Sequence, residues 1–287
     1  MQSNKYKLDK AYIIAEIGIN HNGSLDVVKK LIELAAIVGF DAVKFQKRNP
    51  DVCVPEAQKS KKRMTPWGEI TYLEYKKRIE FEEEEYDQIN SWCKRAGIEW
   101  SASPWDKDSV DFLAKYKLPW VKAPSAVIND ADLLTYIGSK FDRVILSTGA
   151  SDIHMVQAAH RVLERSGVKF IDILHCNSAY PSPVHDLHLN CIPPLAAKFP
   201  GSNVGYSGHE YGVMTTVATV ALGAKIIERH VTLDKGMWGS DQKCSLEPHA
   251  MIKLVRAIRE LEQALGGEEK IVTPLEIEKM KSLRKQK

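Results

Sequence analysis

The sequence of 287 residues has little net charge, few cysteines and no long apolar run. Lys and Arg number 40 against 37 Asp and Glu, a balance of +3 at pH 7. A nucleic-acid-binding protein usually shows a larger, clustered basic excess, so no nucleic-acid partner is expected. No apolar stretch reaches the roughly 18 residues that a membrane helix needs, so no membrane partner is expected.

The five cysteines are an odd number without a paired motif, and this usage favours a reducing compartment. The polar segment from Met1 to Lys10 does not resemble a signal peptide. Together these features predict a cytoplasmic protein. Hydrophobic residues at 44% and charged residues at 27% are ordinary globular usage, which excludes a disordered or fibrous chain.

Short β-rich runs alternate with helical patterns along the chain. The predicted strands lie at 12–19, 42–46, 98–103, 120–125, 143–148, 170–176, 203–207 and 225–233. Helical patterns follow at 25–38, 83–95, 106–116, 131–137, 152–165, 212–222 and 248–265. This alternation predicts an α/β protein, a single-domain (β/α)8 TIM barrel over residues 1–267. A charged tail or linker remnant would cover 268–287. The alternative fold is a doubly wound open sheet, but the Gly-x-Gly-x-x-Gly motif typical of that fold does not follow the first predicted strand.

Polar side chains gather where the predicted strands end, and this is where a TIM barrel has its active site. Side chains alternate between the two faces of a strand, so residues two apart share a face. The apolar neighbours Phe45, Ile227 and Val231 suit the layer beneath the helices. The residues expected in the barrel mouth are therefore Lys44, His209, Glu228 and His230.

His209 follows the seventh predicted strand and His230 lies within the eighth, and these two strands should be neighbours. Two imidazoles with a carboxylate nearby form a candidate site for a divalent metal with open positions. The alternative is that each histidine is a hydrogen-bonded structural residue.

Lys44 and Lys122 place two ammonium groups at the same barrel mouth, among several strand-end serines. A phosphate group needs positive charge and several hydrogen-bond donors, so this set is a candidate phosphate site. The simpler interpretation is that each lysine pairs separately with a carboxylate and that the serines cap the strand ends. A third interpretation is that Lys44 or Lys122 forms a Schiff base with a substrate.

These residues belong to an ordered series of motifs that resembles the sialic acid synthase family, which includes N-acetylneuraminate, legionaminate, pseudaminate and spore-coat polysaccharide synthases. The resemblance covers about residues 11–265. The matching segments are 15–23 (AEIGINHNG), 41–46 (DAVKFQ), 103–106 (SPWD), 147–149 (STG), 175–181 (HCNSAYP), 205–209 (GYSGH), 228–230 (ERH) and 245–248 (SLEP).

The resemblance implies a TIM-barrel transferase that condenses phosphoenolpyruvate with an open-chain N-acylated amino sugar. The products would be a nine-carbon 2-keto acid and phosphate. It implies that phosphoenolpyruvate is held by Lys44, Ser103, Lys122, Ser125, Ser147, Ser178 and Ser207. A divalent metal, Mn²⁺ or Mg²⁺, would be bound by His209 and His230. The residues implied around the sugar, the metal and its water are Glu16, Tyr180, Glu228 and Asp241.

The sequence departs from the family pattern at two places. Val127 stands where many members have an acidic residue that contacts the sugar, which argues against assigning N-acetylmannosamine as the substrate. The family's small C-terminal domain, which reaches across a homodimer, is not expected here. The segment 47–80, with Trp67, Tyr72 and a lysine cluster, is a candidate substitute lid, and a solvated surface is the simpler interpretation of that cluster.

Two further functions remain open at this point. One is another barrel reaction, a keto-deoxy sugar acid synthase or a Schiff-base aldolase. The other is a sugar- or phosphate-binding barrel without catalytic activity.

Overall fold

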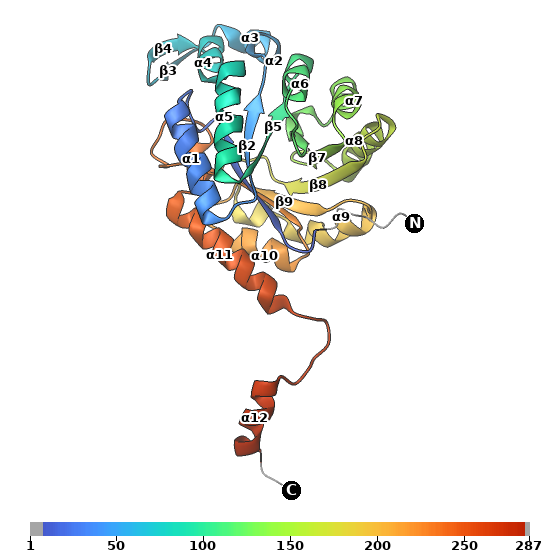
Figure 1. Ribbon diagram of the computed structural model, residues 1–287. Helices are drawn as coiled ribbons and strands as arrows, with labels where there is room; N and C mark the ends of the chain where they lie inside the picture. Colours follow the sequence, from blue (N-terminus) through green and yellow to red (C-terminus); the bar gives the residue numbers. More distant parts are fainter. Residues whose placement is uncertain (1–7, 285–287) are drawn as a thin grey trace.

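The computed structural model describes residues 8–284, and its centre is one sheet of eight parallel strands (Figure 1). The strands are β1 (Tyr12–Gly18), β2 (Ala42–Lys47), β5 (Glu99–Pro104), β6 (Val121–Ala123), β7 (Arg143–Ser147), β8 (Phe170–Cys176), β9 (Val204–Gly208) and β10 (Ile226–His230). Their spatial order is β5-β2-β1-β10-β9-β8-β7-β6. The hydroxyl of Ser101 in β5 donates to the carbonyl of Trp120 just before β6, so the two end strands meet and the barrel is nearly closed. The predicted TIM barrel is confirmed.

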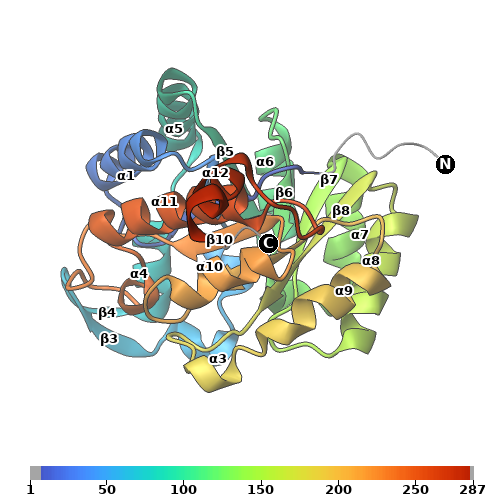
Figure 2. The ribbon, with the colours of Figure 1, turned by 90° about the horizontal axis from the view of Figure 1, so that it is seen from below.

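Helices alternate with the strands and surround the sheet (Figure 2). They are α1 (Leu25–Val38), α5 (Glu83–Ala96), α6 (Lys107–Ala114), α7 (Ala131–Lys140), α8 (Ile153–Arg165), α9 (Ile192–Lys198), α10 (Met214–Ala221) and α11 (Pro248–Leu265). Single turns of 3-10 helix lie at Ser125–Val127, Val184–Asp186, Leu189–Cys191 and Gln242–Cys244. Helix α9 was not predicted. Pro193 and Pro194 fall in its first turn, where a helix tolerates proline.

Helix α1 shows how the local sequence sets these elements. The side chain of Ser24 accepts a hydrogen bond from the backbone N–H of Val27 and so caps the first turn. Gly39 ends the helix with φ of 96°, a left-handed conformation that suits glycine. The buried face of α1 packs on the sheet through Val28, Leu31, Ile32 and Ala35.

The barrel interior is built in two layers. The lower layer is apolar and consists of Ile14, Ala42, Trp120, Ile145, Leu174 and Ile226. Two residues further along β1, β2 and β10, the same faces carry Glu16, Lys44 and Glu228. The outward-facing residues Phe45 and Ile227 join the large apolar cluster beneath the helices, as the alternation predicted. The apolar layer therefore closes the bottom of a polar cavity.

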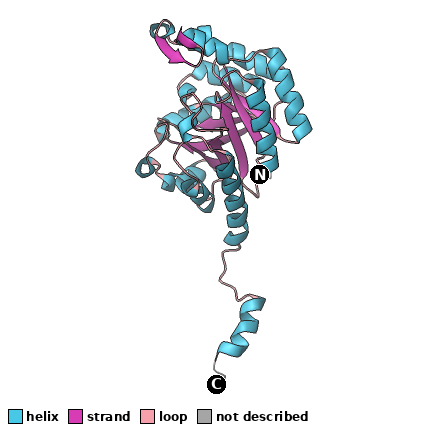
Figure 3. Cartoon of the chain, turned by 90° about the vertical axis from the view of Figure 1, so that its left-hand side faces the viewer, coloured by secondary structure: helices cyan, strands magenta, loops and turns pink. Residues whose placement is uncertain are grey.

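The segment expected as a long lid, residues 47–80, is folded. It contains α2 (Pro50–Cys53), α3 (Glu56–Lys59), the antiparallel hairpin β3 (Lys62–Thr65) and β4 (Gly68–Thr71), and α4 (Tyr72–Ile79). Tyr75 and Trp67 contact Trp238, with ring centroids 4.9 and 6.3 Å apart. The hairpin lies at the end of the molecule opposite the C-terminal helix (Figure 3), beyond the carboxyl end of β2. Its exposed Lys61 and Lys62 agree with a solvated surface.

The C-terminal part projects from the barrel as α12 (Pro274–Leu283) after a connecting segment (Figure 1). The extreme ends of the expected barrel and tail, residues 1–7 and 285–287, lie outside the described part. Within residues 8–284, none of the helices is long and apolar enough to cross a membrane. The five cysteines, all in this range, are free.

Candidate functional site

A cavity of about 330 Å³ opens at the carboxyl ends of the barrel strands. It brings together nearly all the residues singled out from the sequence. The predicted residues that line it are Glu16, Lys44, Ser103, Lys122, Ser125, Ser147, Ser178, Tyr180, Ser207, His209, Glu228 and His230. These residues come from strands and loops along most of the chain, so the barrel closure creates the site.

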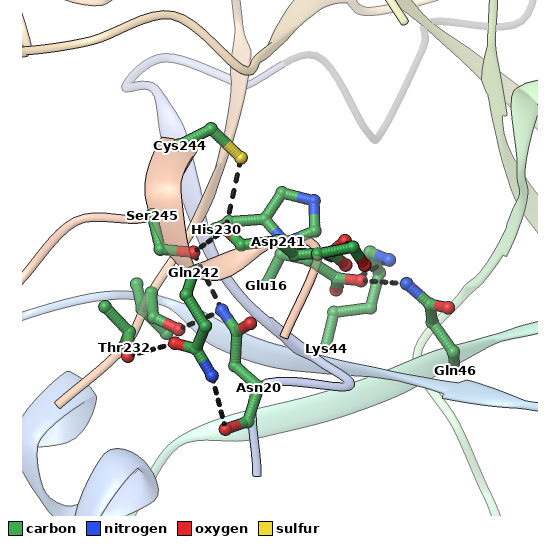
Figure 4. Close-up of polar contacts among 12 residues, drawn as sticks. Glu16, Asn20, Lys44, Gln46, His230, Thr232, Asp241, Gln242, Cys244 and Ser245 are labelled. Carbon is green, nitrogen blue, oxygen red and sulfur yellow. Dashed lines mark hydrogen bonds and ion pairs between the residues drawn. The ribbon is translucent and has the colours of Figure 1, made fainter. Parts of the chain in front are cut away.

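Four charged side chains form a buried, alternating network at the cavity floor (Figure 4 shows the Glu16 end). Lys44 Nζ lies 2.7 Å from Glu16 Oε2 and 3.9 Å from Glu228 Oε2. Lys122 Nζ lies 2.5 Å from Glu228 Oε1. The formal charges of the network cancel, which is how unpaired buried charge is avoided. Glu16 Oε2 and Glu228 Oε2 nevertheless lack a hydrogen-bond partner within the described residues.

The network separates the pKa values of its two carboxyl groups. Burial raises the pKa of Glu16 to about 7, and the Glu228 carboxylate adds to this effect while Lys44 opposes it. Burial also acts to raise the pKa of Glu228, but the ammonium groups of Lys122 and Lys44 prevail and lower it to about 2. Glu228 is therefore the permanent anion of the floor, and Glu16 is the carboxyl group that gains a proton more readily.

Hydroxyl groups surround the two lysines. Lys44 Nζ is 3.2 Å from Ser103 Oγ, and Lys122 Nζ is 3.3 Å from Ser207 Oγ. At one wall the backbone N–H of Gly149 donates to Ser125 Oγ over 2.8 Å. A Cβ atom at Gly149 would collide with the hydroxyls of Ser125 and Ser178, so this glycine keeps a small polar recess open. The recess and the lysines form one surface of donors suited to an anion.

The two predicted imidazoles lie together at the opposite wall, with ring centroids 5.2 Å apart. His209 Nδ1 lies 2.7 Å from the carbonyl oxygen of Asn177. As the donor in that bond Nδ1 carries the proton, so Nε2 keeps a free lone pair. His230 Nδ1 is buried and has no hydrogen-bond partner within residues 8–284. Burial lowers the pKa of both rings to about 3, so both are neutral, as metal ligands must be.

These features fit a divalent metal held by a few protein ligands. The described residues contain no group of three or more His, Cys, Asp or Glu side chains arranged to hold a metal ion. At this wall the two imidazoles are the ligands that the chain would contribute, and the remaining positions would be open to water or substrate. The observation in favour of this arrangement is the buried Nδ1 of His230, which makes no hydrogen bond within the part of the chain that the structure describes.

Asp241, the remaining predicted residue, lies beside the cavity and reaches it through His230. Its Oδ2 is 3.9 Å from His230 Nδ1. Its loop is fixed by Asn20, which donates to Ser245 Oγ over 2.7 Å, and by Gln242, which donates to the Asn20 carbonyl over 3.1 Å (Figure 4). The conformation of this loop thus depends on the loop that follows β1.

The phenol of Tyr180 covers the imidazoles, with its ring centroid 4.0 Å from that of His209. Tyr180 is 47% exposed and therefore forms part of the cavity entrance. Val127, the residue that departs from the family pattern, is buried in the apolar cluster beneath the helices. Position 127 therefore contributes no polar group for contact with a sugar.

Sequence reasoning missed several residues of the wall. Gln46 donates to Glu16 Oε1 over 3.2 Å and accepts from the guanidinium of Arg48. Trp105 and Cys176 line the cavity, and Cys176 Sγ lies 3.8 Å from His209 Nδ1. The period of two could have found Gln46, since it shares a face with Lys44. A larger hollow of about 1020 Å³ adjoins the cavity at Cys176 and Ser178 and extends over α8 and α9.

Comparisons with known proteins identify the relatives of this chain. The profile of the NeuB family matches residues 31–270. N-acetylneuraminate-9-phosphate synthase of Homo sapiens is 37% identical over 268 residues, which are 93% of this chain and 74% of the relative. N,N'-diacetyllegionaminic acid synthase of Campylobacter jejuni subsp. jejuni is 37% identical over 263 residues, covering 90% of this chain and 78% of the relative.

A solved structure extends the agreement to the fold. The N-acetylneuraminic acid (sialic acid) synthetase from Leptospira borgpetersenii serovar Hardjo-bovis, crystallised with citrate, superposes with a TM-score of 0.84 at 28% identity. The match covers 100% of this chain and 98% of that chain. The family profile and the relatives confirm the resemblance found in the sequence: the chain belongs to the NeuB family of sialic acid synthases and related sugar-acid synthases.

Proposed function

We propose that this protein condenses phosphoenolpyruvate with the open-chain aldehyde of an N-acylated amino sugar and releases phosphate. The observation that supports this most strongly is the composition of the cavity floor, where two lysines, two glutamates and a set of serine hydroxyls share one space with two imidazoles. Relatives named as sugar-acid synthases support the reaction class.

Phosphoenolpyruvate would bind through Lys44 and Lys122. In the present network each ammonium group faces a glutamate at 2.5–2.7 Å. A phosphate or carboxylate group of the substrate would share these cations, and each cation at close range contributes about 4 kcal/mol at an effective dielectric of about 20. Ser103, Ser125 and Ser178 would donate to the remaining oxygens.

His209 and His230 would hold the divalent metal, Mn²⁺ or Mg²⁺. When bound, such an ion acts as a Lewis acid toward a carbonyl oxygen. The chain itself orients the aldehyde between this wall and the lysines, and orientation of two reactants supplies much of the acceleration in reactions of this type. Tyr180, against the His209 ring, would close the entrance and exclude bulk water.

The bond changes follow from the two substrates. C3 of the enol attacks the aldehyde carbon, so a C–C bond forms, the C=O π bond of the aldehyde opens to an alkoxide, and C2 becomes electron-poor. Water adds at C2 and one of its protons neutralises the alkoxide. The C2–O bond to phosphate then breaks, phosphate leaves, and the remaining C2 hydroxyl loses its proton to become the ketone. The product is the 2-keto acid, three carbons longer than the sugar. The paired cations Lys44 and Lys122 would balance the negative charge that grows on the departing phosphate.

A Schiff-base aldolase is disfavoured by the charge network. That chemistry needs a neutral lysine with a lowered pKa. Burial acts to lower the pKa of Lys122, but the Glu228 carboxylate prevails and raises it. Lys44 also lies 2.7 Å from a carboxylate.

Phosphate release tests the proposal. Release should require both phosphoenolpyruvate and an N-acyl hexosamine, and borohydride should not label a lysine. Release without sugar, or a borohydride adduct at Lys44 or Lys122, would refute it. A chain that binds both substrates without turnover would be a binding protein instead.

A further inference from the structure

Arg48, one residue beyond the end of β2, is a buried cation that the proposed function leaves unused. It is 9% exposed. Within residues 8–284 its guanidinium forms no ion pair with a carboxylate, and its Nε has no hydrogen-bond partner. The preceding residue, Lys47, is also buried, but its Nζ lies 3.2 Å from the Glu80 carboxylate and donates to the Phe81 carbonyl over 2.7 Å. Lys47 therefore ties the end of β2 to the segment before α5, and Arg48 does something else.

The guanidinium of Arg48 contacts two residues of the cavity wall. Its Nη2 donates a hydrogen bond to Gln46 Oε1. Its Cζ lies over the ring of Trp105, 4.2 Å from the ring centroid. Gln46 and Trp105 both line the cavity, whereas Arg48 lies behind them and lines a different pocket. One buried cation thus supports a wall residue of β2 and another in the segment after β5.

The hydrogen bond from Arg48 decides which way the Gln46 amide faces. A guanidinium can only donate, so it must meet the oxygen of the amide and not its NH₂ group. The amide nitrogen is then turned to the other side, where Gln46 Nε2 donates to Glu16 Oε1 over 3.2 Å (Figure 4). With the amide reversed, its oxygen would face a carboxylate oxygen, and two acceptors would oppose each other.

The Glu16 carboxyl group is consequently held at both of its oxygens. Gln46 donates to Oε1, and Lys44 Nζ lies 2.7 Å from Oε2. The space around the first contact is tight, because a Cβ atom at Gly18 would lie 3.0 Å from Glu16 Oε1 and 3.2 Å from Gln46 Nε2. The orientation of Glu16 therefore depends on a chain of contacts that begins at Arg48, outside the cavity.

We propose that Arg48 is a positioning residue for the condensation, and that it acts through the Gln46 amide to hold the Glu16 carboxyl group in the orientation that the reaction uses. This rests on the proposed function, in which Glu16 lies around the sugar, the metal and its water. Arg48 does not line the cavity, so it should contribute little to the binding of either substrate. Loss of a supporting contact misplaces a group that acts on the bound substrates, which lowers the rate of the bound complex.

The kinetics of Arg48 variants test this role. The assay uses phosphoenolpyruvate, Mn²⁺ and whichever of N-acetylmannosamine and its 6-phosphate is turned over faster. Arg48→Met should lower kcat about 10- to 100-fold, the loss expected for one hydrogen bond from a charged group. KM for phosphoenolpyruvate should change by less than about threefold. Arg48→Lys keeps a donor and should recover at least about threefold in kcat over Arg48→Met.

A double variant shows whether Arg48 acts through Gln46. In a Gln46→Leu background the amide is gone, so adding Arg48→Met should lower kcat by less than about twofold further. The matched control is Arg259→Met. Arg259 donates to the Ala11 carbonyl and pairs with Asp41 at the amino ends of β1 and β2, so its loss should lower stability and leave kcat unchanged.

A measurement without substrates separates this role from the proposed function. In protein labelled with ¹⁵N-glutamine, the Gln46 side-chain amide is the signal missing from Gln46→Leu. Its protons should exchange with solvent at least about tenfold faster in Arg48→Met than in the wild-type protein. Unchanged exchange, a full additional loss of kcat in the double variant, or a rise in KM at unchanged kcat would overturn the positioning role and leave the proposed function intact. No turnover of either sugar by the wild-type protein would overturn the proposed function itself, and with it the role of Arg48 in the condensation.

Discussion

Strand β10 carries two buried ionic networks that face opposite sides. Glu228 and His230 point into the cavity, whereas Arg229 between them points into the shell beneath the helices. There it meets Glu210, with 3.1 Å between Arg229 NH1 and Glu210 Oε1. Glu210 also accepts from the hydroxyls of Tyr206, Thr215 and Thr216.

The difference between the networks lies in how completely they are satisfied. Arg229 donates to the carbonyls of Gly212 and Glu210 and to the Thr216 hydroxyl, and only its Nε lacks a partner within residues 8–284. In the cavity network Glu16 Oε2, Glu228 Oε2 and His230 Nδ1 make no hydrogen bond within residues 8–284, although Lys44 Nζ forms an ion pair with that Glu16 oxygen over 2.7 Å. The shell network thus serves the fold, and the cavity network retains polar capacity for a ligand.

The largest effect on stability is expected from breaking the shell network. Arg229→Met leaves the Glu210 carboxylate buried without its counter-charge, so the free energy of unfolding should fall by about 3–5 kcal/mol. Denaturant unfolding measures this. The double variant Arg229→Met with Glu210→Leu should recover much of the loss. A decrease in the free energy of unfolding below about 1 kcal/mol in Arg229→Met would show that the shell network does not stabilise the fold in the way described.

The largest effect on activity is expected at the imidazole wall. His209→Ala removes one of the two predicted ligands, so Mn²⁺ content after dialysis should fall and turnover should drop by at least about 100-fold. The control is His160→Gln, a partly exposed histidine of α8 paired with Glu164. Full metal content and activity in His209→Ala would contradict the metal assignment.

Lys44→Met should separate binding from stability. It should raise KM for phosphoenolpyruvate about 10- to 100-fold, which corresponds to one lost contact between charged groups. Stability should fall less than in Arg229→Met, because Glu16, whose pKa is already about 7, takes up a proton when its partner is removed. An equal rise in KM for the sugar would count against the phosphate role, and a stability loss as large as that of Arg229→Met would remove the contrast.

The smallest effect concerns the pH dependence of unfolding. Burial acts to raise the pKa of Glu210, but Arg229 and the threonine hydroxyls prevail and lower it below its ordinary value of 4.5. A carboxyl group with a lowered folded pKa contributes stability above its unfolded pKa, and this contribution disappears as pH falls through the folded pKa. Glu210→Gln should therefore lose stability less steeply below about pH 4.5 than the wild-type protein. Parallel slopes would show that Glu210 makes no such contribution.

The strands and the cavity could be predicted because the alternation of side chains along a strand is a local property of the sequence. A period of two placed Lys44, Glu228 and His230 on the inner face, and the order of strands in a barrel brought them together. The serines and Asp241 came from the resemblance. Asp241 is positioned by contacts between loops far apart in the chain, through Asn20 and Gln242, and no local pattern encodes these.

The segment 47–80 was the part that sequence reasoning resolved least. Its hairpin and short helices are stabilised by packing on Trp238, a contact that no periodicity reveals. Lys76 and Lys77 are adjacent and chemically identical, yet one is buried and one is exposed. Which of the two lysines is buried depends on how α4 packs, so only the structure distinguishes them.

The mass of the product tests the central claim most directly. Phosphoenolpyruvate, Mn²⁺ and a panel of N-acyl hexosamines and their 6-phosphates would be incubated with the protein and analysed by mass spectrometry. The account predicts a product equal to one sugar plus one pyruvate, formed with one phosphate per turnover and absent in Lys44→Met at low phosphoenolpyruvate. Unchanged sugars alongside hydrolysed phosphoenolpyruvate would contradict it.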